Sequence, residues 1–299
     1  MWFKNVRVYR LSAPLTIDAA ALEQALAEYK FTPCSGREAL RSGFSFPLHP
    51  SIKHYSHQQN QRWYFAIKRQ EKVLPAAVIN EELAPKLDAA ATEAGRPLSR
   101  KEKQALKEDL IQTLLPRAFS RSSLTQGYYD GERQWLVLNT GSASKAEDIL
   151  ALLRKALGSL PALPWLDSHK LNQQLQLWLQ QQSLPAQFQL GAAVELKAPD
   201  EEGAKVKFSN HLLTADEVQT HLQDKLVTRL SLQQEQGLAL TVADDGGIKQ
   251  IQYPDALFEQ NEELGWDDLI SRLDADLILM ADSLDQALQA ISAQVNGSH

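Results

Sequence analysis

The sequence predicts an α+β fold with strand-helix modules at both ends and a helix-rich middle. Segments rich in β-branched and aromatic residues, such as "NVRVYRLS" and "GLALTVA", lie near the two ends of the chain. Between them, leucines recur at helical spacing over residues 80–158. Strands come in runs that regular helical crossovers do not separate, which favours α+β over a parallel α/β sheet. The predicted divisions are residues 1–79, 80–160 and 161–299.

The N-terminal module begins with a strand in "NVRVYRLS" and continues into a helix that opens at Ile17-Asp18. Leu22 and Leu26 belong to the apolar stripe of this helix. Residues 35–61 are punctuated by glycine and proline, so we expect a loop there. The segment "RWYFAIKRQEKVLP" then predicts two short strands around a polar turn.

A capping box predicts a central helix that starts at Ser99, because the side chains of Ser99 and Glu102 can each satisfy a backbone N–H of the other. Pro116 marks the end of this helix. Its apolar face consists of Leu106, Leu110 and Leu114.

The pattern then changes to strand in "GYYDGERQWLVLN", with a hairpin turn at Asp130-Gly131. A second capping box, Ser144 with Glu147, predicts a further helix, and Gly158 stands where a C-terminal glycine belongs.

The C-terminal module follows the proline-bounded segment "SLPALPWLDS". We expect strands in "KVKFSNHLL", "KLVTRLSLQ" and "GLALTVA", and a short helix at a third capping box, Thr214 with Glu217. Asp245-Gly246 predicts a hairpin turn into "IKQIQYP", and the remainder of the chain is acidic and helical.

Charge is segregated along this chain of net charge −6. Residues 244–299 contain twelve acidic and two basic residues, a net charge of −10, so residues 1–243 carry +4. One part of the protein can therefore present a basic surface while another stays acidic. The chain has no apolar run long enough to span a membrane and no signal-peptide pattern, so we expect a cytoplasmic protein.

Motifs for nucleotide or cofactor binding are absent from the sequence, so we expect no cofactor. Two metal sites can be considered: a histidine cluster, and adjacent aspartates that could hold magnesium for phosphodiester cleavage. For both sets of residues a structural role is the stronger interpretation. Cys34, the single cysteine, is interpreted as a core thiol. The sequence therefore predicts a protein that is not an enzyme. The residues considered for a metal are the histidines His49, His54 and His57, and the aspartates Asp244, Asp245, Asp267 and Asp268.

Basic residues gather in and beside the central helices. Arg100, Lys103 and Lys107 are spaced i, i+3, i+7, which places them in one row along the helix. Such a row is either a solvated surface or a surface that binds phosphates. The candidate DNA-binding residues are Arg100, Lys101, Lys103, Lys107, Arg117, Arg121, Lys145, Arg154 and Lys155.

Several segments resemble, in order and over nearly the whole chain, the recombination-associated RdgC proteins. They are "WFKNVRVYRL", "FTPC", "EKVLP", "LLPRAFSR", "KAEDILALLRKALGSLP", "DDGG" and "DLILMA". The resemblance implies a horseshoe-like subunit and a homodimeric ring that encircles double-stranded DNA with little sequence preference. It also implies a nucleoid-associated protein that restrains RecA in recombination and replication-fork repair, with single-stranded DNA as a second candidate ligand. Phe119, in "LLPRAFSR", is implied as a contact that closes the ring.

Other interpretations remain beside this one. The acidic C-terminal helices could bind a recombinase directly, with only incidental DNA contact. The aspartate pairs could support a metal-dependent nuclease. Phe119 could instead pack into the core of its own subunit, or stack on bases.

Overall fold

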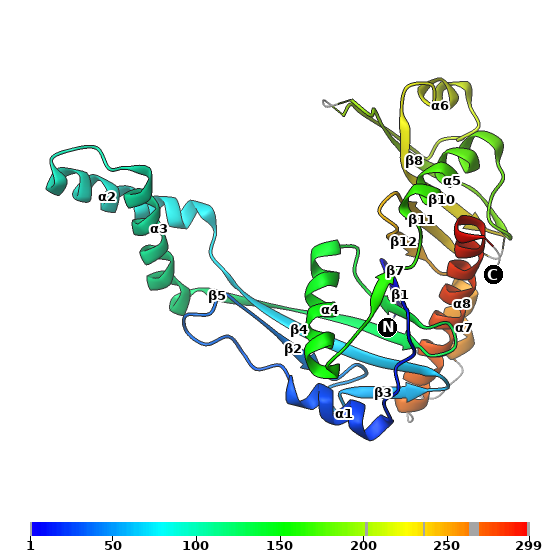
Figure 1. The fold of residues 1–299 in the computed structure, drawn as a ribbon, viewed down its shortest axis with the longest axis horizontal. Coiled ribbons are helices and arrows are strands. Elements are labelled where there is room, and N and C mark those ends of the chain that lie inside the picture. Colours follow the sequence, from blue (N-terminus) through cyan, green and yellow to red (C-terminus); the bar gives the residue numbers. More distant parts are fainter. Residues whose placement is uncertain (1, 201–202, 236, 263–268, 298–299) are drawn as a thin grey trace.

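The computed structural model describes residues 2–200, 203–235, 237–262 and 269–297, whose strands form two antiparallel sheets. Helices pack on both sheets, which confirms the predicted mixture of antiparallel strands and helices. Figure 1 shows the elements along an open arc, with residues 76–114 at one end and residues 188–221 at the other.

Seven of the described strands form the first sheet: β1 (Arg7–Leu11), β2 (Leu40–Ser45), β3 (Ser56–Gln59), β4 (Arg62–Val73), β5 (Phe119–Asp130), β6 (Trp135–Leu138) and β7 (Ala162–Pro164). Their order is β2-β4-β5-β6-β1-β7, and β3 pairs with β4 beside the end of β2. β4 and β5 pair along their whole length, from Arg62 opposite Asp130 to Val73 opposite Phe119. The predicted hairpin turn at Asp130-Gly131 is confirmed.

Two expectations for the N-terminal module were wrong. The predicted loop of residues 35–61 contains β2 and β3, and the two short strands predicted after it are the single strand β4. Residues 56–61 and residues 68–72, the second half of β4, are polar, so the sequence lacks the apolar alternation of a strand there. The backbone of β4 is instead held by β2 and β3 on one edge and by β5 on the other. Long-range pairing overrides local pattern here.

Beyond the body of the sheet, β4 and β5 extend as a ribbon that carries a helical hairpin. The hairpin consists of α2 (Ala76–Ala94), α3 (Arg100–Leu114) and a 3-10 turn, η1 (Leu115–Arg117). Ile79 and Leu83 of α2 pack against Leu110 of α3 in a small separate core. The capping box of Ser99 with Glu102 is confirmed, and α3 ends just before Pro116.

The two faces of the first sheet are covered differently. α1 (Ala19–Glu28) and α4 (Ala143–Leu157) pack on one face, where Leu26 and Leu150 join a cluster with Phe65 and Leu138. The other face contacts α8 (Leu269–Asn296). Both faces are thus apolar in the body of the sheet.

The second sheet has the order β12-β11-β10-β8-β9, and helices cover one of its faces. Its strands are β8 (Phe188–Lys197), β9 (Lys205–Ser209), β10 (Leu226–Gln234), β11 (Ala239–Ala243) and β12 (Ile248–Gln252). The remaining helices are α5 (Ser168–Gln181), α6 (Asp216–His221) and α7 (Asp255–Glu262). α5 and α8 lie on the outer side of this sheet, and its strands line the inner side of the arc (Figure 1).

Several predictions for the later helices need correction. Asp18 caps α1 as expected, but the N-cap of α4 is Ser142 rather than Ser144. α6 exists, but its N-cap is Ala215, so the third capping box does not form. α5 was not predicted, because its many glutamines between prolines resemble a polar connection. Gly158 does end α4, with a positive φ of 74°.

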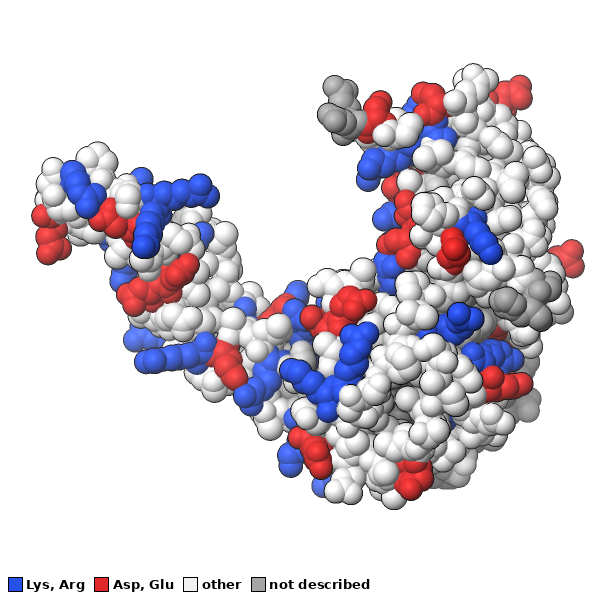
Figure 2. All heavy atoms as spheres, viewed as in Figure 1, with Lys and Arg blue, Asp and Glu red and all other residues white. Residues whose placement is uncertain are grey.

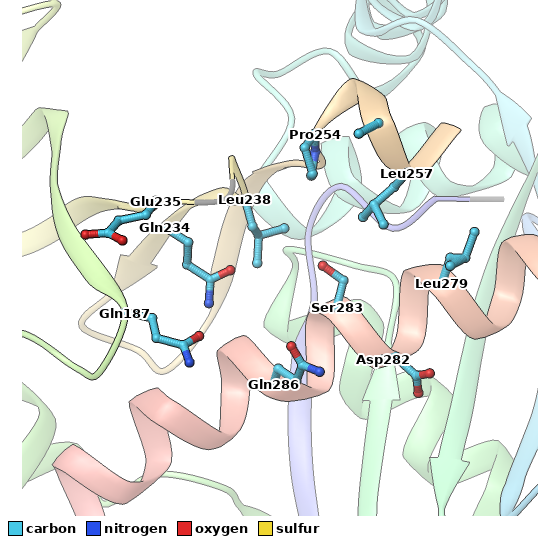
Figure 3. Close-up of a pocket in the computed structure, with 11 residues that line it drawn as sticks. Gln187, Gln234, Glu235, Leu238, Pro254, Leu257, Leu279, Asp282, Ser283 and Gln286 are labelled. Atoms are coloured by element: carbon cyan, nitrogen blue, oxygen red, sulfur yellow. The ribbon is translucent and has the colours of Figure 1, made fainter. Parts of the chain in front are cut away.

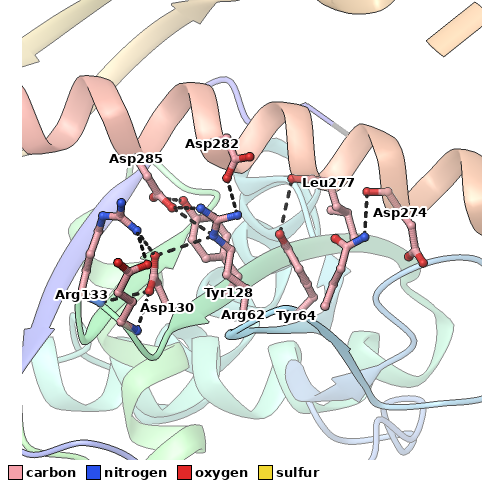
Figure 4. A network of polar contacts seen from close by, with 11 residues as sticks. Arg62, Tyr64, Tyr128, Asp130, Arg133, Asp274, Leu277, Asp282 and Asp285 are labelled. Atoms are coloured by element: carbon pink, nitrogen blue, oxygen red, sulfur yellow. Dashed lines mark hydrogen bonds and ion pairs between the residues drawn. The ribbon is translucent and has the colours of Figure 1, made fainter. Parts of the chain in front are cut away.

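A buried polar network holds α8 against the first sheet (Figure 4). The Arg62 guanidinium of β4 donates to the Asp285 carboxylate at 2.7 Å and lies 2.6 Å from that of Asp282. The Tyr128 hydroxyl donates to Asp285 at 2.6 Å. Arg62 also lies 3.7 Å from Asp130 at the end of β5. Among the described residues, no helix combines the length and apolar character that crossing a membrane requires.

Candidate nucleic-acid interface

The cations of α3 are presented to solvent at the end of the arc. Arg100, Lys101 and Lys103 are exposed, and Lys107 is half-buried. Within the described part of the chain, no carboxylate lies at ion-pair distance from any of these four. No described residue therefore neutralises their charge, which remains available to a phosphate.

Phe119 is exposed over 87% of its surface at the start of β5. The chain leaves α3, passes through η1 and enters the strand directly, so this ring has no core to enter. Packing of Phe119 in its own subunit is thereby excluded. Arg117 is also exposed, and no described carboxylate pairs with it.

Among the candidates near α3, Arg121 has a described carboxylate partner, Glu71. It stands opposite Glu71 in the ladder, and its Nε donates to the Glu71 carboxylate at 3.0 Å. The hydrogen bond and charge of Arg121 lower the pKa of Glu71, and Arg69 and Lys145 lower it further. Glu71 therefore brings Arg121 of β5 and Lys145 of α4 into one neighbourhood.

The remaining candidates lie on α4. Lys145 and Lys155 are exposed, at opposite ends of this helix. Arg154 is exposed too, but its Nε donates to the Leu160 carbonyl at 3.4 Å and so also holds the following loop. The nine predicted cations thus form two groups. One lies on α3 and η1 at the end of the arc, and the other lies on β5 and α4 toward its base (Figure 1).

A third group was missed by sequence reasoning. Lys205, Lys207, Arg229 and Lys249 lie on the strands of the second sheet. Figure 2 shows basic side chains along the inner side of the arc at both ends, interleaved with acidic ones near the second sheet. The alternation of Lys205 and Lys207 in "KVKFS" was the available signal, because residues two apart share one face of a strand.

The candidates for catalysis are not brought together. Among the described residues, no three His, Cys, Asp or Glu side chains are arranged to hold a metal ion. His57 lies 2.6 Å from Asp274 of α8, and the backbone carbonyl of Gln70 accepts from Cys34. Asp245 is paired with Arg7, while Asp267 and Asp268 lie outside the described residues.

A pocket of about 610 Å³ opens between α7, α8 and the β10–β11 turn (Figure 3). Its walls are amide and acidic side chains, among them Gln187, Gln234 and Asp282, together with Leu238 and Leu257. No Lys or Arg is among the described residues that line it. Such a pocket does not suit a phosphate.

The acidic side chains of α8 are largely engaged within the subunit. Asp274 meets His57, while Asp282 and Asp285 meet Arg62. Burial raises the pKa of Asp285 to about 6, although the Tyr128 hydroxyl and Arg62 both lower it. These carboxylates hold α8 against the first sheet.

Known proteins match this chain over almost its full length. A family model described as "Putative exonuclease, RdgC" matches residues 1–298. The chain is 40% identical over 298 residues to the recombination-associated protein RdgC of Shewanella oneidensis, covering 99% of this chain and 98% of the relative. It is 39% identical over 293 residues to that of Pseudoalteromonas translucida (98% and 97% covered) and 38% over 298 residues to that of Proteus mirabilis (99% of each).

Proposed function

We propose that this chain, which belongs to the RdgC family, is a non-enzymatic protein that encircles double-stranded DNA as a homodimeric ring. The relatives are named for recombination, and we propose that the ring modulates RecA-dependent recombination and replication-fork repair on the nucleoid. Single-stranded DNA is a second candidate ligand.

The observation that carries the DNA-binding proposal is the placement of unpaired cations. The row on α3 has no described carboxylate partner, whereas the acids of α8 are turned toward the first sheet. Lys and Arg that neutralise phosphates release counterions, which gives affinity without reading bases. The net charge of −6 is no obstacle, because charge is segregated along the chain, with −10 on residues 244–299 and +4 on residues 1–243.

The ring proposal depends on Phe119. The Phe119 side chain is apolar and exposed over 87% of its surface, so covering it with a second copy of the chain would be favourable. Two-fold symmetry would bring both copies of this residue into the same contact.

The direct protein-interaction function ranks second because the α8 carboxylates that it needs are largely engaged in the subunit. The word exonuclease in the family description favours testing a nuclease as well. Of the four aspartates considered for magnesium, Asp244 is half-buried beside Asp245, and burial and that neighbour raise its pKa.

Charge reversal tests the proposal. The variant Lys103→Glu with Lys107→Glu should bind a mixed-sequence duplex at least about tenfold more weakly at low salt, because two cations that neutralise phosphates become anions that repel them. The matched control is Lys53→Glu with Lys170→Glu, which changes two exposed lysines in the β2–β3 loop and on α5. Equal weakening by both variants would mean that only net charge matters, and the interface on α3 would be wrong.

A further inference from the structure

The face of the second sheet that α5 and α8 leave uncovered has more cations than an ordinary solvated face needs. An antiparallel sheet with one face on a core presents polar residues on the other, usually of both signs. Here Lys205 stands directly opposite Lys197 in the β8–β9 ladder. Like charges directly opposite destabilise a pair of strands. A ligand of negative charge would remove this repulsion.

The same face contains a row of three charges that crosses three strands. Lys207 is opposite Glu195, and Glu195 is opposite Arg229. The Arg229 Nη1 donates to the Glu195 carboxylate at 3.1 Å, and the Lys205 Nζ lies 3.9 Å from it. The Glu195 side chain is only 16% exposed, whereas that of Arg229 is 48% exposed. One carboxylate thus lies beneath a rim of cations.

A β-bulge in β12 adds further polar groups beside this row. Thr241 pairs with Lys249 and Ala239 pairs with Gln252, so β12 has one extra residue there. Gln250 adopts a φ of 52°, a backbone conformation that residues other than glycine rarely adopt. Its backbone N–H donates to the Asn5 side chain at 3.1 Å, and its side-chain carbonyl accepts from the Thr241 hydroxyl at 3.1 Å. Bulges of this kind redirect side chains at binding sites.

These groups surround one hollow of about 150 Å³. The described residues that line it include three cations, Lys207, Arg229 and Lys249, but a single acidic side chain, Glu195. Neither Lys207 nor Lys249 has a described carboxylate within ion-pair distance. The amides of Asn5 and Gln250 complete the wall.

We infer that this hollow binds a phosphate group, and that Glu195 is a resident counter-ion which Arg229 leaves when phosphate enters. Phosphate suits the site because it accepts hydrogen bonds from several cations and amides at once. Two sources share this chemistry: the backbone of DNA and free inorganic phosphate. The DNA source deepens the proposed function and rests on it, since the strands line the inner side of the arc.

Glu195 gives the inference its sharpest test, because removing its charge should strengthen binding rather than weaken it. Glu195→Gln should bind a mixed-sequence duplex about three- to tenfold more tightly at constant salt, since a carboxylate that repels phosphate is neutralised. Lys207→Gln with Lys249→Gln should weaken binding and reduce the log–log salt slope by about 0.9 for each phosphate that is no longer neutralised. Lys170→Gln, on α5 at the opposite face, should leave both quantities unchanged.

A second arm uses inorganic phosphate as the probe and thermal unfolding as the readout. If free phosphate occupies the hollow, it should raise Tm above chloride at equal ionic strength in wild type but not in the Lys207/Lys249 variant. The expected change in duplex binding would support the site with DNA as the source of phosphate, and the expected rise in Tm would support it with free phosphate as the source. Wild-type duplex affinity and slope in all the variants, with no phosphate effect on Tm, would overturn the inference while leaving the proposed function intact. Failure of the wild-type protein to bind duplex would instead refute the proposed function.

Discussion

Replacing Phe119 by serine should break the dimer without unfolding the subunit. The side chain is exposed over 87% of its surface and packs against no core cluster of the described residues. Phe119 pairs with Val73 at the end of the β4–β5 ladder, and serine can make the same backbone pairing. The free subunit therefore loses little stability when the aromatic ring is removed.

The cost appears only on association. Burying one phenylalanine side chain contributes about 1.5–3 kcal/mol. A two-fold contact contains the residue twice, so the variant should lose about 3–6 kcal/mol of dimerisation free energy. That loss corresponds to a dimer dissociation constant raised by about 10²- to 10⁴-fold.

Sedimentation equilibrium over a dilution series measures this constant directly, and urea unfolding checks the subunit. Leu163→Ser is a matched control, because Leu163 of β7 is an apolar side chain exposed over 48% of its surface outside the ribbon. Only the Phe119 variant should dissociate at concentrations where wild type is dimeric. If Phe119→Ser sediments like wild type across the series, the proposed closing contact is wrong.

Further predictions concern the buried network and catalysis. Arg62→Met should lower the free energy of unfolding by about 3–5 kcal/mol, measured by urea, because Asp285 stays buried without the guanidinium that pairs with it, whereas Asp130 keeps Arg133; a decrease below about 1 kcal/mol would show that the network contributes little. Since burial raises the pKa of Asp285 to about 6 from 3.8, the folded state holds its proton more tightly. The stabilisation from this group is full below about pH 4 and is lost as pH rises through 6, so the stability of wild type minus that of Asp285→Asn should fall by about 3 kcal/mol between pH 4 and 7. A difference that does not change with pH would contradict the raised pKa. Incubation of DNA with magnesium should release no nucleotides, and release that Asp244→Asn abolishes would establish a nuclease instead.

The parts of the fold that the sequence predicts well are those set by local chemistry. The capping box of Ser99, the glycine end of α4 and the turn at Asp130-Gly131 each depend on a few neighbouring residues, and each is confirmed. The errors lie where partners distant in sequence decide. β4 remains one strand through polar residues because strands on both of its edges supply its hydrogen bonds.

The candidate site follows the same division. Helical spacing was enough to align Lys103 and Lys107 along α3, because one helix determines it, although Lys103 is exposed and Lys107 is half-buried. The row from Lys207 through Glu195 to Arg229 could not be predicted, since its members come from three strands whose register only the folded sheet shows. The engagement of the α8 acids likewise depends on contact with Arg62, more than 200 residues away in the sequence.

The central claim is that cations on the inner side of the arc bind DNA by neutralising phosphates. The most direct test is fluorescence anisotropy of two unrelated duplexes across a salt series. We predict equal affinities and a log–log slope of several units, since each phosphate contact adds about 0.9. No binding at low salt, or a strong preference for one sequence with a slope near zero, would contradict the claim.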